Sequence, residues 1–372
     1  MIPVNTPLLD GNERKYVNEC LDGGWISSEG PFVKRFETEF SAAVGRKYGI
    51  AVTNGSAALD IAVAALGLKD GDEVIMPAFT IISCAAAIVR NGAVPILIDA
   101  DPQTWNMRVK DIEAKITART RAIMAVHIYG LPVDMQPVLD IAEKYHLRII
   151  EDAAEMHGQT YCGKPCGSFG DISTFSFYPN KHITTGEGGM LVTDDAELAE
   201  RCRSYRNLFF PTKERRYVHE ELGWNCRMSN MQAALGVAQL EKLSEHIDKK
   251  RWIGALYTEL LGNVEEITLP LAHTDYADNI YWVYGIVLKD KIPFDNVEMT
   301  HRLADAGIGS RLFFSPMNIQ PALRKLGLFA DECYPVAEKL ATRGLYIPAG
   351  LGIAEAEIRK VAETVKELIV KI

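Results

Sequence analysis

The chain has 372 residues, of which 48% are hydrophobic and 24% are charged, a composition typical of globular proteins. Its net charge of −9 argues against nucleic acid as the main partner. Seven cysteines, an odd number, favour a reducing, cytoplasmic location over a secreted disulfide framework. We expect no signal peptide and no membrane span, because the chain has no apolar run of the required kind. We also expect no bound metal, because Cys162 and Cys166 have no second Cys/His pair nearby.

From residue 48 to residue 193, short β-rich runs alternate with helical patterns. The expected strands are YGIAVT (48–53), DEVIMP (72–77), AVPILID (93–99), RAIMAVHIY (121–129), RIIED (148–152), DISTFSF (171–177) and GGMLVT (188–193). Helical patterns separate several of them, at 56–68, 84–92 and 135–146. The alternation predicts an α/β domain with a mostly parallel sheet covered on both faces. Ligands in such sheets bind at the carboxyl ends of the strands.

The remainder of the chain predicts a smaller α+β domain. A long helical pattern covers 230–261, followed by a strand at 281–288, a helix at 297–307 and an amphipathic helix at 355–372. We therefore predict a large α/β domain over residues 1–240 and a small α+β domain over residues 241–372.

The first expected strand runs into Asn54-Gly55-Ser56-Ala57, where a helix begins. Ser56 is a good helix N-cap, and free amides at a helix start attract phosphate. A capped helix without any ligand is the alternative interpretation of this segment.

Two further strand ends carry groups with chemistry. The run RIIED ends in Glu151-Asp152, and an acid at a buried strand end needs a positive partner, either a protonated pyridine nitrogen or a structural arginine. The run DISTFSF delivers Ser176 and then Lys181, whose amine can form a Schiff base with an aldehyde when desolvated.

Together, a phosphate-binding helix start, an acidic strand end and a strand-end lysine match the needs of pyridoxal 5′-phosphate (PLP). This cofactor requires a phosphate site, a carboxylate at the pyridine nitrogen and a lysine at C4′.

With these residues, the chain resembles the DegT/DnrJ/EryC1/StrS family of PLP-dependent nucleotide-sugar aminotransferases. The resemblance rests on IEDAAE (150–155), TFSFYPNKHITTGEGGM (174–190) and LGWNCRMSNMQAALGVAQL (222–240), and it extends over nearly the whole chain. It implies a fold-type I (aspartate aminotransferase-like) large domain with a mixed, mostly parallel seven-stranded sheet.

The resemblance also implies roles for individual residues. Lys181 corresponds to the catalytic lysine that carries the cofactor, Asp152 to the partner of the pyridine nitrogen, and Glu155 to a neighbour of the ring's phenolic oxygen. Asn225, in GWNCRM, would reach the phosphate of the partner subunit's cofactor, which implies a homodimer with shared sites. The remaining phosphate-binding residues would be Gly55, Ser56, Ala57 and Ser176.

Two departures from the family pattern affect the expected ligand contacts. The family usually places an aromatic ring after the threonine of P-x-x-T; here Ile81 stands there, so either Ile81 or Phe79 would face the pyridine ring. The family often reads P-M-H near residue 318, where this chain has Asn318, an expected sugar contact. Arg215 and Arg216, beside Lys213, are candidates to bind the nucleotide, with a solvated charged loop as the alternative.

The implied activity is transfer of the amino group of L-glutamate to a nucleotide-linked 4-keto-6-deoxy sugar. The resemblance is greatest to members that aminate C4 of GDP-4-keto-6-deoxymannose to give GDP-perosamine for surface polysaccharides. Two alternatives stay open, a PLP-dependent sugar dehydratase and a non-catalytic regulatory protein on the same fold. A small dehydratase branch has histidine in place of the lysine; Lys181 disfavours that alternative, although the adjacent His182 is shared with it.

Overall fold

The computed structural model describes residues 1–210 and 217–370. Its main sheet has seven strands in the order β1–β9–β8–β5–β4–β2–β3. β9 is antiparallel to both of its neighbours, and the other neighbouring strands are parallel, which confirms the predicted mixed sheet. The strands are β1 (Tyr48–Val52), β2 (Glu73–Pro77), β3 (Val94–Ile98), β4 (Thr120–Val126), β5 (Arg148–Asp152), β8 (Ile172–Ser176) and β9 (Gly189–Thr193).

Side chains alternate along these strands and contribute to two cores, one on each face of the sheet. Ile50 and Val52 of β1 belong to the first core, and Ala51 between them belongs to the second. Helices α3 (Gly55–Ala65), α4 (Ile82–Arg90) and α6 (Ala196–Tyr205) close the first core. Helices α1 (Glu13–Asp22), α2 (Pro31–Ala43), α5 (Met135–Tyr145) and α7 (Asn230–Glu241) close the second.

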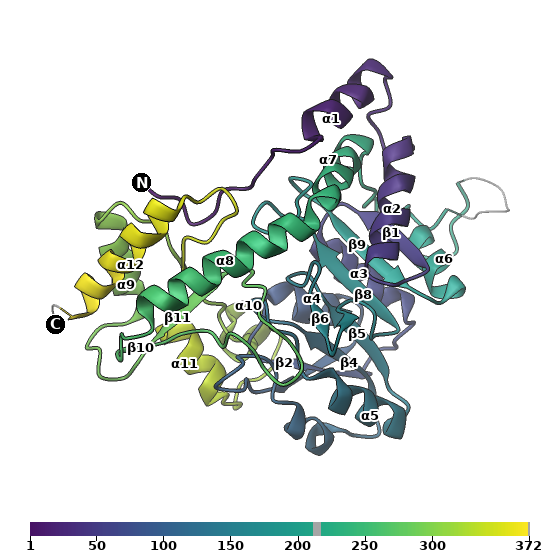
Figure 1. Cartoon of the computed structure of the whole chain (residues 1–372). Helices are drawn as coiled ribbons and strands as arrows, with labels where there is room; N and C mark the ends of the chain where they lie inside the picture. The colour runs from purple at the N-terminus through teal and green to yellow at the C-terminus, as the bar shows by residue number, and fades with distance from the viewer. Residues whose placement is uncertain (211–216, 371–372) are drawn as a thin grey trace.

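A smaller unit is built around a four-stranded antiparallel sheet in the order β10–β11–β13–β12. Its strands are β10 (Ile267–Thr268), β11 (Tyr284–Leu288), β12 (Arg311–Leu312) and β13 (Gly344–Ile347). Its helices are α8 (Leu243–Leu261), α9 (Asn296–Asp305), α10 (Pro321–Arg324), α11 (Pro335–Arg343) and α12 (Glu355–Val370). In Figure 1, α9 and α12 lie at one end of the molecule, the large sheet lies at the other, and α8 runs between them.

The structure differs from the sequence expectation at two places in this organisation. The helical pattern at 230–261 is divided into α7 and α8 at Lys242, whose φ of −104° and ψ of 4° interrupt the helix. Residues 2–6, predicted within the large domain, pair with the small unit instead. There the Ile2 amide donates to the Gly307 carbonyl (2.8 Å), and the Ala349 amide donates to the Val4 carbonyl (3.2 Å). The boundary at residue 240 stays a prediction.

The minor elements are a hairpin and three short helical turns. They are β6 (Thr160–Tyr161), β7 (Lys164–Pro165), η1 (Val109–Asp111), η2 (Glu113–Lys115) and η3 (Met317–Ile319). In the part of the chain that the structure describes, no helix has the length and apolar character needed to cross a bilayer.

Candidate active site

A cavity of about 370 Å³ lies where the carboxyl ends of β1, β4, β5 and β8 meet the small unit. This is the edge of the sheet at which ligands are expected in α/β folds. The volume falls within the range of small-molecule sites. The lining includes most of the predicted residues: Gly55, Ser56, Ile81, Asp152, Glu155, Ser176 and Lys181.

Lys181 enters the cavity from the turn that follows β8, where its amide donates to the Tyr178 carbonyl (2.9 Å). Its Nζ lies 3.7 Å from Oε1 of Glu155 and 3.7 Å from the centroid of the Trp282 ring. Burial lowers the pKa of Lys181, while the carboxylates of Glu155 and Asp152 oppose that shift. A buried amine with a lowered pKa is a better nucleophile near neutral pH.

Asp152 ends β5, and its buried carboxylate borders the same cavity. Oδ1 accepts a hydrogen bond from the Ala154 amide (3.0 Å), and Oδ2 accepts one from Sγ of Cys84 (3.3 Å). Burial raises the pKa of Asp152. Among the described residues that line the cavity there is no arginine to pair with this carboxylate. The arrangement therefore suits a protonated ring nitrogen as the positive partner.

Glu155 follows in the turn after β5. Its Oε2 accepts from the Tyr129 amide (2.7 Å), and its Oε1 faces the Lys181 amine. Burial raises the pKa of Glu155 to about 8, although the positive charge of Lys181 opposes the shift. A carboxyl group that keeps its proton near neutral pH can serve as a proton donor beside the amine.

The start of α3 provides the polar part of the cavity that sequence reasoning assigned to phosphate. Asn54, not the predicted Ser56, caps the helix, because α3 begins at Gly55, two residues earlier than a Ser56 cap would place it, and Asn54 Oδ1 accepts from the Ala57 amide (2.8 Å). The Ala57 amide is thereby occupied. Ser56 lies in the first turn, where its hydroxyl bonds Oγ of Ser83 (2.7 Å). The amides of Gly55 and Ser56 meet no acceptor within the described chain, as phosphate binding requires.

Close backbone packing brings Ser176 against this helix start. A Cβ added at Gly55 would lie 2.8 Å from Cβ of Ser176, and one added at Gly189 would lie 2.4 Å from the Asn54 carbonyl oxygen. Both positions therefore require glycine. The Ser176 hydroxyl and the free amides together form a cradle that fits a phosphate group.

The comparisons with known proteins agree with this chemistry. The sequence profile of the DegT/DnrJ/EryC1/StrS aminotransferase family matches residues 7–366. The chain belongs to this family. It is 40% identical to the GDP-perosamine synthase of Escherichia coli O157:H7 over 98% of each chain. It is 42% identical to the GDP-perosamine synthase of Caulobacter vibrioides over 99% of this chain and 98% of that one. The PLP form of the putative sugar aminotransferase Spr1654 from Streptococcus pneumoniae superposes with a TM-score of 0.92 at 25% identity, covering 100% and 99% of the two chains.

Of the two apolar residues considered for the ring of the cofactor, Ile81 borders the aminotransferase cavity and Phe79 does not. Ile81 is 43% exposed, whereas Phe79 is fully buried. The Phe79 ring packs edge-on against Tyr129, with the centroids 5.9 Å apart, and also contacts Phe313 and Phe314. Phe79 is therefore a core residue, and the prediction that it could face the cavity is wrong.

The remaining predicted residues lie apart from the aminotransferase cavity. Asn225 is exposed, and its Oδ1 accepts from Nη2 of Arg227 (3.0 Å). Asn318 is fully buried, its Nδ2 donates to Oε1 of Glu338 (2.7 Å), and it does not line the cavity. The candidate nucleotide-binding residues Lys213, Arg215 and Arg216 lie outside the described residues.

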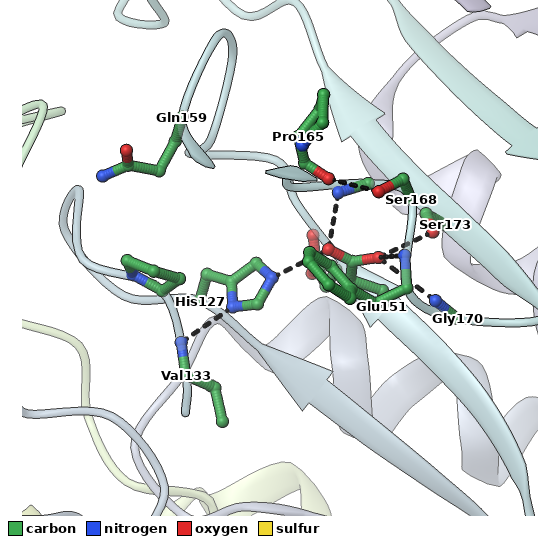
Figure 2. A network of polar contacts seen from close by, with 12 residues as sticks. His127, Val133, Glu151, Gln159, Pro165, Ser168, Gly170 and Ser173 are labelled. Atoms are coloured by element: carbon green, nitrogen blue, oxygen red, sulfur yellow. Dashed lines mark hydrogen bonds and ion pairs between the residues drawn. The ribbon is translucent and has the colours of Figure 1, made fainter. Parts of the chain in front are cut away.

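Glu151 precedes Asp152 on β5 and points to the opposite side of the sheet, into a buried network (Figure 2). Its carboxylate accepts from Nε2 of His127 (3.0 Å) and from Oγ of Ser173 (3.0 Å). Backbone amides add further hydrogen bonds, donated by Gly167, Phe169 and Gly170. Burial alone would raise the pKa of Glu151, but these hydrogen bonds, led by that of His127, hold it below its ordinary value.

Three residues of this network could in principle bind a metal ion, because the ligand atoms of His127, Glu151 and Cys166 lie within 4.8 Å of one another. The Val133 amide donates to Nδ1 of His127 (3.0 Å), so Nε2 carries the ring proton and donates it to Glu151. Neither nitrogen has a lone pair left for a cation. The cluster is a hydrogen-bond network that holds the end of β5, and with it Asp152, in place.

Sequence reasoning missed the small-unit side of the cavity, formed by Trp282, Phe314 and Tyr346. Trp282 lies beneath the Lys181 amine, and its Nε1 donates to the Asn180 carbonyl (2.9 Å). The available signal was the group of aromatic residues in YWVYGIVL (281–288) and RLFF (311–314).

Proposed function

We propose that this aminotransferase uses PLP to move the amino group of L-glutamate to the keto carbon, C4, of a nucleotide-linked 4-keto-6-deoxy sugar. The observation that carries the proposal is the meeting of Lys181, Asp152 and the free amides of α3 in one cavity. GDP-4-keto-6-deoxymannose is the proposed acceptor and GDP-perosamine the product. This choice is supported by relatives from three bacteria, 38–42% identical, that are named GDP-perosamine synthase.

The residues present fit the cofactor group by group. The amides of Gly55 and Ser56, with the Ser176 hydroxyl, would hold the phosphate. The Asp152 carboxylate would pair with the ring nitrogen, and the Lys181 amine would hold the aldehyde carbon. When bound, PLP supplies an electron sink for the carbanion that forms at the substrate.

Side chains of the protein carry out the proton transfers of the reaction. Lys181 Nζ removes the proton from Cα of glutamate and, in the second half of the reaction, delivers one to C4 of the sugar. Glu155, 3.7 Å away, holds a proton beside that amine near neutral pH. Asp152, fixed by the Ala154 amide and the Cys84 thiol, stabilises positive charge at the ring nitrogen.

An amine at position 181 also favours transamination over the dehydratase alternative. His182 cannot replace it, because its ring is buried away from the cavity with Nε2 3.2 Å from the Ile280 carbonyl. A regulatory protein without catalysis would not require the buried Lys181–Glu155 pair.

We further propose a cytoplasmic homodimer with shared sites. Asn225 is exposed and outside its own chain's cavity, so a role in phosphate binding requires a second copy. Mixing the variants Lys181→Ala and Asn225→Asp tests this arrangement. If sites are shared, heterodimers hold one site with both native residues and recover activity. Proven heterodimers without recovery, given an inactive Asn225→Asp parent, would contradict it.

The cofactor and the reaction are tested separately. Borohydride reduction of the purified protein, followed by peptide mapping, should place a pyridoxyl group on Lys181. Glutamate should bleach the cofactor band, and a panel of dTDP-, UDP- and GDP-linked keto-sugars should yield an amino sugar best from the GDP compound. A pyridoxyl group on Lys164, or a band insensitive to glutamate, would contradict the proposal.

A further inference from the structure

A second cavity of about 290 Å³ adjoins the catalytic one. Four residues line both cavities, namely Tyr178, Asn180, Trp282 and Tyr346, so the two cavities are neighbours that share part of their lining. The second cavity lies between the turn before Lys181, the segment around Asn5 and the small-unit strands β12 and β13.

Arg311 is the charged residue of this second cavity. It stands opposite Tyr346 in the antiparallel pair of β12 and β13, so both side chains project from the same face of that sheet. Its Nη1 donates to the Ser310 carbonyl (3.0 Å). Among the cations that line the two cavities in the described chain, Lys181 faces Glu155, whereas Arg311 makes no ion pair.

A second polar group points to the same ligand. Asn180 Oδ1 is buried and has no hydrogen-bond partner, and Asn180 lines both cavities. A buried acceptor without a partner costs free energy unless a ligand supplies the donor. Hydroxyl groups of a sugar, or an ammonium group, would satisfy it beside an anion held by Arg311.

Charge and space in the catalytic cavity require a second subsite. The charged residues of its lining are the carboxylates of Asp152 and Glu187 and the Lys181 amine, while Glu155 keeps its proton near neutral pH. An anionic substrate gains nothing from that balance. Its volume of about 370 Å³ must also contain the cofactor and the reacting carbon, so the remainder of a nucleotide-sized substrate has to extend beyond it.

We propose that the second cavity binds the anionic part of a substrate, with the Arg311 guanidinium as its recognition group. This inference rests on the proposed function. Phosphate and carboxylate both match the planar fork of arginine, so the anion is either the diphosphate of the nucleotide sugar or a carboxylate of glutamate.

Two measurements on the PLP-loaded protein distinguish these sources. Calorimetric titration with GDP reports nucleotide affinity without turnover. Single-turnover bleaching of the cofactor band against glutamate concentration reports the amino donor alone. Arg311→Ala should weaken either the affinity for GDP or the apparent affinity for glutamate by about 10- to 100-fold, the range for a lost charge-assisted hydrogen bond. Arg311→Lys should recover part of that loss, because it keeps the charge but not the fork.

Arg359→Ala is the matched control, since it removes one arginine from α12, where Arg359 pairs with Glu355. It should leave both affinities unchanged, and all three variants should keep the native melting temperature. A loss in the GDP arm assigns Arg311 to the diphosphate, and a loss in the glutamate arm assigns it to the carboxylate.

If the native protein responds to both ligands and Arg311→Ala equals it in both arms, the Arg311 assignment is overturned while transamination stands. A native protein that responds to neither ligand overturns the proposed function and this inference with it.

Discussion

The two sides of the catalytic cavity are built in different ways. On the large-unit side, Asp152 ends β5 and accepts from the Ala154 amide, and Lys181 lies in the turn after β8, where its own amide donates to the Tyr178 carbonyl. On the small-unit side, Trp282, Phe314 and Tyr346 come from separate loops and strands and offer aromatic faces. Groups that react need precise placement, which a hydrogen-bonded sheet provides. The aromatic side shapes the space and excludes water.

A buried lysine of α8 stabilises the backbone of the small-unit side. Lys250 of α8 is buried, and its Nζ donates to the carbonyls of Trp282 (2.8 Å) and Ala349 (2.6 Å). Burial lowers the pKa of Lys250 to about 7. One side of the cavity is thus held by strand ends, whereas Trp282 on the other side is held by the buried Lys250 amine and by its own hydrogen bond to Asn180.

The largest expected effect concerns Lys181 on the large-unit side. Lys181→Ala should reduce transamination by about 10²–10⁴-fold, because the reaction loses its general base and its covalent attachment point. Turnover and cofactor absorbance measure this. Lys164→Ala, which removes an exposed lysine stacked on Phe169, should behave as the native protein. Lys181→Ala with more than a tenth of native turnover would contradict the assignment.

The second-largest loss of turnover is expected for Asp152→Asn. The variant should still bind the cofactor but lose about 10²–10³-fold in turnover, equivalent to roughly 2.7–4 kcal/mol for a preorganised electrostatic group. Asp140→Asn on the surface of α5, where Asp140 accepts from Gln136, is the control. If Asp152→Asn turns over at the native rate with cofactor bound, the carboxylate is structural and the contrast between the two sides weakens.

On the small-unit side, the prediction for Lys250 concerns the free energy of unfolding and not the rate of turnover. Its folded-state pKa lies below the unfolded value, so the unfolded chain binds more protons between pH 7 and pH 10.5. Stability from this group therefore rises with pH across that window, by about 2 kcal/mol from pH 7 to pH 9.

Urea unfolding at the two pH values measures the Lys250 contribution as the difference between the native protein and Lys250→Met. The variant should lose this rise. A Lys242→Met variant, which removes a half-buried lysine paired with Glu245, should keep this rise. An identical pH dependence in native and Lys250→Met protein would show that Lys250 is charged in the fold.

The smallest effect is expected at Cys84, which donates to Oδ2 of Asp152. Burial raises the pKa of Cys84 well above its ordinary value, so the thiol keeps its proton. Cys84→Ala should lower turnover by about 2- to 10-fold, because a thiol is a weak donor and the Ala154 amide still holds Asp152, and Cys84→Ser should restore turnover. Cys202→Ala, at a buried cysteine of α6, should leave turnover unchanged. Equal rates in all four proteins would show that Asp152 needs no second donor.

The difference between the two sides also explains what could be predicted from sequence. All seven strands of the main sheet were predictable, because each is a short apolar run bounded by turn residues, and Asp152 and Lys181 were predictable because they follow such runs. The helix cap was not, since Asn54 and Ser56 are equally good caps and only the exact helix start decides between them.

The positions of Trp282 and Arg311 could not be predicted. Both residues follow Lys181 by about 100 residues or more, and only the packing of the small unit against the large one brings them to the site. The Phe79 prediction failed for a related reason. Its ring fills the space against Phe313 and Phe314 of the small unit, which no local pattern reveals.

The pairing of residues 2–6 with the small unit has a consequence for how the chain folds during synthesis. Ile2 bonds Gly307, and Val4 and Thr6 accept from Ala349 and Gly352, contacts that span more than 300 residues. This segment must therefore wait until residues 307–352 have left the ribosome. Domains generally fold as they emerge, so the large sheet can form first while this segment is still unpaired. The small unit is completed last, and the turn before Lys181 receives its hydrogen bond from Asn5 to Pro179 only then.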